Sequence, residues 1–250
     1  MTAVILIHGA WQGSWAWDAF VPLLRAAGFD PVAVDLPGNG TGPIRPEDVS
    51  AADCLTHLEG VLNRTGPAHV IGHSGGGVFA SMLAEARPDA VLSLTYVAGM
   101  MLPDGGSFAR IVADLLPEHP EAAGIGPWLI WSDDRRLSRV PPEAARKIFL
   151  HDCPPDAAQR LTPQGEGARA VTPRLTPARY GRVPRLYVEA TGDRSVVLAV
   201  QRRMQELSPG AERATLTTGH VPQLAAPADL LAVIRPFLMA HEPLTQGAMQ

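Results

Sequence analysis

The pentapeptide Gly72-His73-Ser74-Gly75-Gly76 contains the residue types of a nucleophilic serine site. It satisfies the pattern G-x-S-x-G, which is too short to be decisive alone. Its setting adds weight, because it follows an apolar run and opens a helix-like segment, and a strand, a sharp turn and a helix together form a nucleophile elbow. Glycines two positions before and after the serine let the strand and the helix approach closely. We therefore predict that Ser74 is the nucleophile.

A serine hydroxyl is a poor nucleophile at neutral pH, so a histidine must take its proton and a carboxylate must orient that histidine. His220 lies between the last predicted strand and the final predicted helix. This places it on a loop at the carboxyl edge of the sheet, where open α/β folds bind ligands. Asp193 occupies the corresponding loop after the preceding strand. We predict His220 as the base and Asp193 as the acid; Asp104 is the rival acid, and Asp35 is expected to hold its own turn.

The loop after the first predicted strand can supply an oxyanion hole. The backbone N–H groups of Ala10 and Gly75 are predicted to converge on the reacting centre, and Gly9 permits the close approach. The positive end of the helix that follows Ser74 favours an oxyanion at the same place. His8 is expected to be a structural histidine that binds the loop. The remaining histidines are expected to be structural or at the surface: His57, His69, His73, His119, His151 and His241.

Short Val/Ile/Leu runs alternate with amphipathic stretches along the chain, which predicts strands covered on both faces. The predicted strands are residues 4–7, 31–34, 69–71, 91–97, 185–188 and 214–216. The predicted helices are residues 15–27, 51–63, 76–86, 198–207 and 228–239. This order predicts a doubly wound, mostly parallel sheet of about six strands with right-handed crossovers.

One segment interrupts this rhythm. Residues 103–182 hold many prolines and helical fragments at 143–150 and 156–161, but no convincing strand. We predict that they form a helical lid, inserted into a core made of residues 1–102 and 183–250. The predicted substrate pocket beneath the lid is lined by Trp11, Met100, Met101, Trp128, Trp131 and Val221. Met100, Met101, Trp128, Leu129 and Trp131 could equally form the packed interior of the lid.

Composition excludes several classes of function. The 250 residues are 46% hydrophobic and 18% charged, with 21 Lys and Arg against 25 Asp and Glu and no basic run. A nucleic-acid partner is therefore not expected. The N-terminus has no cationic region before its apolar run, and no window approaches the roughly 20 apolar residues of a membrane span. We expect a cytoplasmic protein in which Cys54 and Cys153 are reduced structural thiols.

The chain resembles members of the α/β-hydrolase family over nearly its whole length. Within it, the sequence is similar to the branch of plant methyl esterases, hydroxynitrile lyases and bacterial pyrethroid-type carboxylesterases. The resemblance rests on His8-Gly9-Ala10-Trp11 with Gly13-Ser14-Trp15, Asp35-Leu36-Pro37-Gly38-Asn39-Gly40, Gly72-His73-Ser74-Gly75-Gly76, residues 149–155, Thr191-Gly192-Asp193-Arg194 with Gln201, and Gly219-His220. It implies the triad Ser74, Asp193 and His220, and an oxyanion hole at Ala10 and Gly75.

Two positions separate esterases from lyases within this branch. By resemblance, the lyases carry threonine where this chain has Gly9, and lysine where it has Val221. A cation is needed to hold cyanide as an anion, and valine cannot supply one. We therefore expect a serine carboxylesterase that hydrolyses a small, fairly apolar ester or lactone through an acyl-enzyme, without a metal or organic cofactor.

Three alternatives stay open at this point. They are hydroxynitrile-lyase-like chemistry, carbon–carbon hydrolysis or cyclisation on the same triad, and a non-enzymatic ligand-binding relative. The oligomeric state is also open, with a homodimer among the possibilities.

Overall fold

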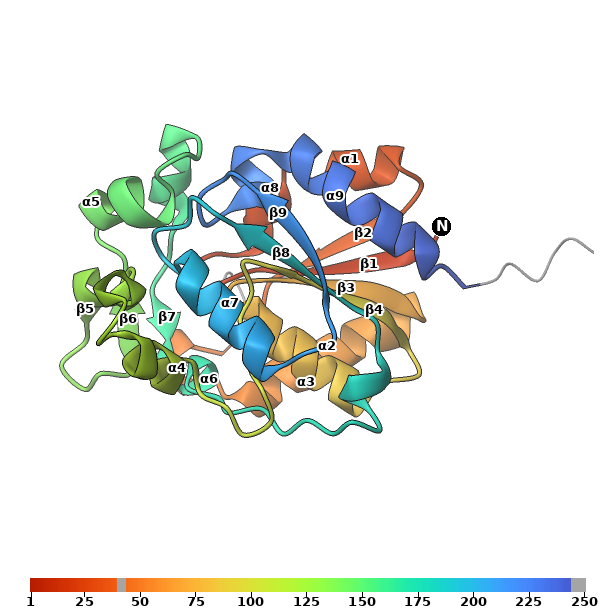
Figure 1. The fold of residues 1–250 in the computed structure, drawn as a ribbon, viewed down its shortest axis with the longest axis horizontal. Helices are drawn as coiled ribbons and strands as arrows, with labels where there is room; N and C mark the ends of the chain where they lie inside the picture. The colour runs from red at the N-terminus through yellow and green to blue at the C-terminus, as the bar shows by residue number, and fades with distance from the viewer. Residues whose placement is uncertain (40–43, 244–250) are drawn as a thin grey trace, which may run out of the picture.

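The computed structural model describes residues 1–39 and 44–243, so Gly40 of the predicted turn lies outside it. Six parallel strands form the main sheet in the order β2-β1-β3-β4-β8-β9, which confirms the predicted doubly wound sheet (Figure 1). Their bounds are Ala3–Ile7 for β1, Asp30–Val34 for β2, Ala68–His73 for β3, Val91–Val97 for β4, Arg185–Ala190 for β8 and Glu212–Leu216 for β9.

Strand β1 shows why apolar runs become strands here. All five of its residues are buried. Val4 and Leu6 pack on one face of the sheet with Trp17 and Phe20, whereas Ile5 and Ile7 pack on the other face with residues of α2 and α3. Because side chains alternate between the two faces of a strand, an apolar run such as β1 contributes to the hydrophobic cluster on each face. A strand with only one apolar face would contribute to one of them alone.

The helices cover both faces of this sheet (Figure 1). Helices α2 (Ala51–Thr65) and α3 (Gly76–Ala86) lie on one side, and α1 (Val21–Ala26) and α9 (Pro227–Ala240) lie on the other. Helix α7 (Leu198–Leu207) follows β8, and the short α8 (Pro222–Ala225) precedes α9. A capping box fixes the start of α2: Asp53 N–H binds the Ser50 hydroxyl, and the Asp53 carboxylate binds Ser50 N–H.

The prediction of one helix over residues 15–27 was wrong. A 3-10 turn at Ser14–Trp17 comes first, and α1 begins only at Val21. Pro22, at the start of α1, cannot donate a backbone hydrogen bond to a preceding turn, so a continuous helix is broken there.

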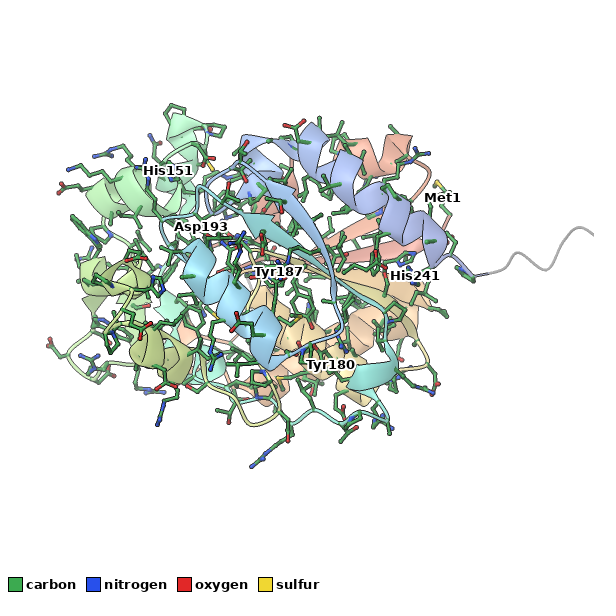
Figure 2. The ribbon with its side chains drawn as sticks, viewed as in Figure 1. Met1, His151, Tyr180, Tyr187, Asp193 and His241 are labelled. Atoms are coloured by element: carbon green, nitrogen blue, oxygen red, sulfur yellow. The ribbon has the colours of Figure 1, made fainter. Side chains whose placement is uncertain are left out.

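Residues 103–182 are here called the β4–β8 connection. Residues 108–169 lie beyond the carboxyl ends of the strands, at the left of Figure 1, and the last residues of the connection run back past the end of α3, where Figure 2 labels Tyr180. The connection holds the short helices α4 (Phe108–Leu115), α5 (Pro142–Ala144) and α6 (Glu166–Arg169). The helical prediction at 143–150 corresponds to α5 and a π turn at Ala145–Phe149, and that at 156–161 to a 3-10 turn at Pro155–Arg160.

The expectation that this connection contains no strand was wrong. Strands β5 (Ile130–Trp131), β6 (Leu137–Arg139) and β7 (Gln164–Gly165) pair as a small antiparallel sheet. Strands of two or three residues are too short to show an alternating pattern, so the sequence gives no sign of them. Within the described ranges, no helix is both long enough and apolar enough to cross a membrane.

Candidate active site

Ser74 lies in a sharp turn between β3 and α3. Its backbone has φ 49°, in the left-handed region that a non-glycine residue rarely adopts. The neighbouring glycines are required for space: a Cβ at Gly72 would lie 2.9 Å from the Gly76 carbonyl oxygen, and a Cβ at Gly76 would lie 2.6 Å from that of His8. The backbone crowding that the G-x-S-x-G pattern predicts is therefore present, and it holds a strained serine against the end of β1.

Asp193 and His220 meet as predicted from their loops. Nδ1 of His220 lies 2.7 Å from Oδ2 of Asp193, and both side chains are fully buried. Figure 2 shows Asp193 at the tip of β8, beside the start of α7. Its Oδ1 accepts the N–H groups of Ser195 and Val196 at 2.7 and 2.9 Å, so the carboxylate is fixed by its own loop. Because a carboxylate accepts at Nδ1, the ring presents Nε2 as its proton acceptor.

Nε2 of His220 is buried and has no hydrogen-bond partner among the residues that the structure describes. The imidazole lies between two other rings, with centroids 4.9 Å from His73 and 5.0 Å from Phe149. Since His73 adjoins Ser74 in the chain, this packing brings the His220 loop against the elbow. The Ser74 hydroxyl and Nε2 do not form a hydrogen bond in this unliganded state, and such bonds commonly tighten only when substrate is present.

The predicted oxyanion loop approaches the same serine. A Cβ on Gly9 would lie 2.9 Å from Cβ of Ser74. On this loop the Gly9 N–H donates to Gln12 Oε1 at 3.3 Å, and the Trp11 N–H donates to Gln164 Oε1 at 3.2 Å. The intervening Ala10 N–H, like that of Gly75, has no acceptor within the described part of the chain. Neither of the two N–H groups that the sequence predicts as oxyanion donors is therefore committed to another acceptor among these residues.

His8 and His73, the two other histidines near Ser74, both form structural hydrogen bonds. His8 Nε2 accepts the Leu36 N–H at 3.1 Å, so its Nδ1–H donates to the Gly9 carbonyl at 2.7 Å. His73 Nε2–H donates to the His220 carbonyl at 2.8 Å, and Nδ1 faces Gln12 at 3.0 Å. Burial lowers the pKa of His8 and, more strongly, that of His73. Both rings are therefore neutral, and neither is aimed at the Ser74 hydroxyl as a base.

The rival carboxylates are occupied elsewhere. Asp104 Oδ1 accepts the Leu175 N–H at 2.9 Å, which ties two parts of the β4–β8 connection together. Asp35 Oδ1 accepts the Ser14 N–H at 2.6 Å, so it holds the loop before α1 rather than its own turn. Asp193 alone of these three carboxylates contacts His220.

A cavity of about 250 Å³ opens beside Ser74. From the core it is lined by Trp11, Met100, Ser195 and Val196, and from the β4–β8 connection by side chains that include Phe108, Val112, Ile125 and Leu129. Ser74 and Ser195 contribute the hydroxyl groups of this wall, and no charged side chain contributes to it among the described residues. Such a surface suits an uncharged, largely apolar ligand.

Four residues predicted to line the pocket lie outside this wall. Met101 is fully buried among core residues beside β4, and Val221 is fully buried in a cluster with Phe149. Trp128 is 40% exposed. Trp131 lies on β5 with the Arg135 guanidinium 4.6 Å above its ring. Bulk and hydrophobicity identified these side chains, but their direction depends on tertiary packing, which no local pattern shows.

The predictions from the sequence did not include several residues of the cavity wall and its surroundings. Phe108, Ile111, Val112 and Leu115 recur at helical spacing on α4, and this apolar face could have been read as a buried one. Phe149, which touches the His220 ring, lies in a predicted helical fragment and in a stretch that resembles the family, and neither pattern predicts a contact with the base. Ser195 carries no signal beyond its place two residues after Asp193.

Thiol and metal chemistry find no support in the described residues. Burial raises the pKa of both Cys54 and Cys153 to about 12, so neither is a thiolate at neutral pH, and both are free. No group of three or more metal-ligating side chains gathers in residues 1–39 and 44–243.

Known proteins with similar sequences and structures include hydrolases and esterases. Residues 4–233 match the model of the Alpha/beta hydrolase family. The sequence is 32% identical to a pyrethroid hydrolase of Sphingobium wenxiniae, over 99% of this chain and 91% of that protein. It is 28% identical to esterase PIR7B of Oryza sativa subsp. japonica, over 83% of this chain and 84% of that protein. The crystal structure of the pyrethroid hydrolase PytH superposes with a TM-score of 0.84 at 30% identity, over 96% of this chain and 98% of that chain.

Proposed function

The chain belongs to the alpha/beta hydrolase family and is an ester-hydrolysing enzyme, and from that premise we propose that it is a serine carboxylesterase working through an acyl-enzyme. The observation that carries the proposal is the buried Asp193–His220 pair, 2.7 Å apart, packed against the elbow of Ser74. A neutral imidazole with one nitrogen bound to a carboxylate and the other unpartnered is poised to accept a hydroxyl proton.

In the first half-reaction Ser74 Oγ attacks the ester carbonyl, and its proton passes to Nε2 of His220. Negative charge then develops on the carbonyl oxygen. The N–H groups of Ala10 and Gly75 donate to this oxyanion, and Asp193 stabilises the imidazolium. Collapse of the tetrahedral intermediate breaks the bond to the alcohol, which leaves with the proton from His220.

In the second half-reaction water takes the place of the alcohol. His220 removes a proton from the water, which attacks the acyl carbonyl, and the same two N–H groups stabilise the second oxyanion. Ser74 leaves with the proton held by His220, which releases the carboxylic acid and restores the starting state.

The substrate is proposed to be a small, uncharged and mostly apolar ester. The 250 Å³ cavity lacks a charged wall residue among those described, so an ester carrying a carboxylate or an ammonium group would lose hydration without a compensating partner. Because much of this wall comes from residues 108–129, we propose that the β4–β8 connection is a lid that sets which esters fit.

Lyase chemistry is disfavoured by the residue after the base. Val221 is fully buried in an apolar cluster and carries no charge. A cyanide leaving group needs a nearby cation, and the cavity wall offers none among the described side chains. Hydrolysis needs only water at the acyl carbonyl, which this arrangement supports.

The test is the kinetics of p-nitrophenyl butyrate and p-nitrophenyl hexanoate with the wild-type chain and Ser74→Ala. We expect rapid release of one equivalent of p-nitrophenol before the steady state whenever deacylation limits turnover, and loss of about 10³- to 10⁶-fold in kcat for Ser74→Ala. Circular dichroism should show an unchanged fold. A folded Ser74→Ala variant that retains activity would exclude the mechanism.

A further inference from the structure

The loop that carries His220 is held from two directions. On the sheet side, Thr218 O accepts the Gly192 N–H at 2.9 Å and His220 O accepts His73 Nε2–H at 2.8 Å. On the other side, the loop meets residues 149–153 of the β4–β8 connection, here called the clamp segment. The mechanism above assigns no role to this segment.

The first contact of the clamp segment is a hydrogen bond to the backbone just before the base. Asp152 Oδ2 accepts the Gly219 N–H at 2.5 Å, a charge-assisted bond of the stronger kind. A Cβ on Gly219 would lie 2.5 Å from both Asp152 Oδ1 and His151 Cε1, so only glycine allows this approach. The close fit ties the backbone of residue 219 to the connection.

The second contact is made to the imidazole itself. Phe149 is fully buried, and its ring centroid lies 5.0 Å from that of His220. The Phe149 ring also lies against Trp11 of the oxyanion loop, with ring centroids 5.4 Å apart and nearly perpendicular planes. Phe149 therefore fills the space between the base and the oxyanion loop and limits rotation of the His220 ring away from Asp193.

The third contact joins the clamp segment to the residue after the base. Cys153 Sγ lies 3.9 Å from the Val221 carbonyl, a weak contact that places the clamp segment beside the residue after the base as well as the one before it. Residues 219, 220 and 221 thus each touch the clamp segment, through Asp152, Phe149 and Cys153 respectively.

We propose that Asp152 and Phe149 are positioning residues for His220. A catalytically competent triad therefore depends on the packing of the clamp segment against the His220 loop. This inference rests on the proposed function for its kinetic consequence. Neither residue touches the reacting atoms: Asp152 fixes the backbone and Phe149 fixes the ring. Displacing a catalytic group by about 1 Å can lower a rate by as much as 10²-fold, so modest losses of these contacts should be visible.

The experiment compares Asp152→Ala with Asp152→Asn, because asparagine keeps an oxygen that can accept the Gly219 N–H. Asp156→Ala is the matched control, since Asp156 is an exposed aspartate just after the clamp segment. We expect Asp152→Ala to lower kcat per titrated active site about 10-fold with KM changed less than twofold. Asp152→Asn should retain at least a third of wild-type kcat, and Asp156→Ala should match the wild type.

A second readout does not require turnover. The proton between His220 Nδ1 and Asp193 should give a downfield proton NMR signal, which Asp152→Ala and Phe149→Leu should broaden or remove and Asp152→Asn should keep. Normal kcat per active site and a normal signal in Asp152→Ala would overturn the inference. Equal losses in the alanine and asparagine variants, with a lowered Tm and an unchanged signal, would do so as well. A wild-type chain that cleaves no ester would instead contradict the proposed function. The NMR comparison would still test whether Asp152 and Phe149 position His220.

Discussion

The carboxyl edge of the sheet and the β4–β8 connection face each other across Ser74, and they are built by different means. At the sheet edge, parallel strands fix where each loop begins, and three residues there have left-handed backbone: Trp11, Ser74 and Ala98, with φ of 59°, 49° and 42°. Strain of this kind persists only where the surrounding hydrogen bonds and packing determine the backbone.

The connection has little regular secondary structure and is held by individual side-chain contacts to distant parts of the chain, such as Asp104 with Leu175 and Asp152 with Gly219. Its elements are three short α-helices, 3-10 and π turns, and strands of two or three residues, and it leaves Trp128 and Ile130 about 40% exposed. The edge therefore fixes the chemical groups, whereas the connection supplies most of the apolar wall. The difference predicts that substitutions of the catalytic groups at the edge should change rates by orders of magnitude. Substitutions of cavity-lining side chains in the connection should mainly change which ester is preferred.

The largest contrast is expected between two aspartates that both follow strands of the sheet. Asp193→Asn should lower kcat by about 10⁴-fold, as for the aspartate of other serine triads, because the amide cannot stabilise the imidazolium or fix its tautomer. Asp104→Asn should keep kcat within about threefold, since its contact is the Leu175 N–H in the connection. Steady-state kinetics on one ester measures both, and similar losses in the two variants would contradict the assignment of Asp193.

A smaller loss is expected when the oxyanion loop is forced away from the elbow. The Cβ of Gly9→Ala would lie 2.8 Å from His73 Nδ1 and 2.9 Å from Ser74 Cβ, so the loop must move. We expect kcat to fall by about 10²-fold or more, the scale of losing one oxyanion donor. Gly60→Ala, in the open middle of α2, is the control and should leave kcat unchanged. Wild-type kinetics in Gly9→Ala would show that this loop does not hold the oxyanion.

Stability should depend on pH through the histidines of the sheet edge. Burial lowers the pKa of His8 and His73 in the fold, whereas in the unfolded chain these groups bind protons below pH about 6.5. The free energy of unfolding should therefore be at its full value above that pH. Below it, stability should fall by up to about 1.4 kcal/mol per pH unit for each histidine.

Urea denaturation at pH 7.5, 6.5 and 5.5 measures this slope. His8→Asn should flatten this slope, while substitution of the half-exposed His119 in the connection should not. A free energy of unfolding that is constant over this range would mean that folding does not lower the pKa of the two buried rings.

The smallest effect is expected at Ser195, whose N–H binds Asp193 and whose side chain lines the cavity. A single neutral hydrogen bond contributes about 0.5–1.5 kcal/mol, which is roughly 2- to 12-fold in kcat/KM. We expect Ser195→Ala to lower kcat/KM for p-nitrophenyl 4-oxopentanoate within that range and to leave p-nitrophenyl 4-methylpentanoate, its near-isostere, unaffected. Equal changes for the two esters would show that the hydroxyl does not contact the acyl chain.

The same division explains what the sequence could predict. Strand β4 and helices α3 and α7 match their predicted ranges, because buried Val/Ile/Leu runs and helical periodicity are local signals. Asp193 and His220 could be paired in advance because parallel strands bring their carboxyl ends to one edge. Trp128 and Trp131 were placed wrongly in the pocket wall because side-chain direction in the connection is set by contacts distant in sequence, such as Trp11 with Ser138.

The role of Ser74 is tested most directly by covalent labelling. A fluorophosphonate should add to the wild-type chain with one equivalent per active site, and peptide mass spectrometry should locate the adduct on the Ser74 hydroxyl. The adduct should be absent from Ser74→Ala and should form far more slowly in Asp193→Asn. An adduct on a different residue, or undiminished labelling of Ser74→Ala, would contradict the account.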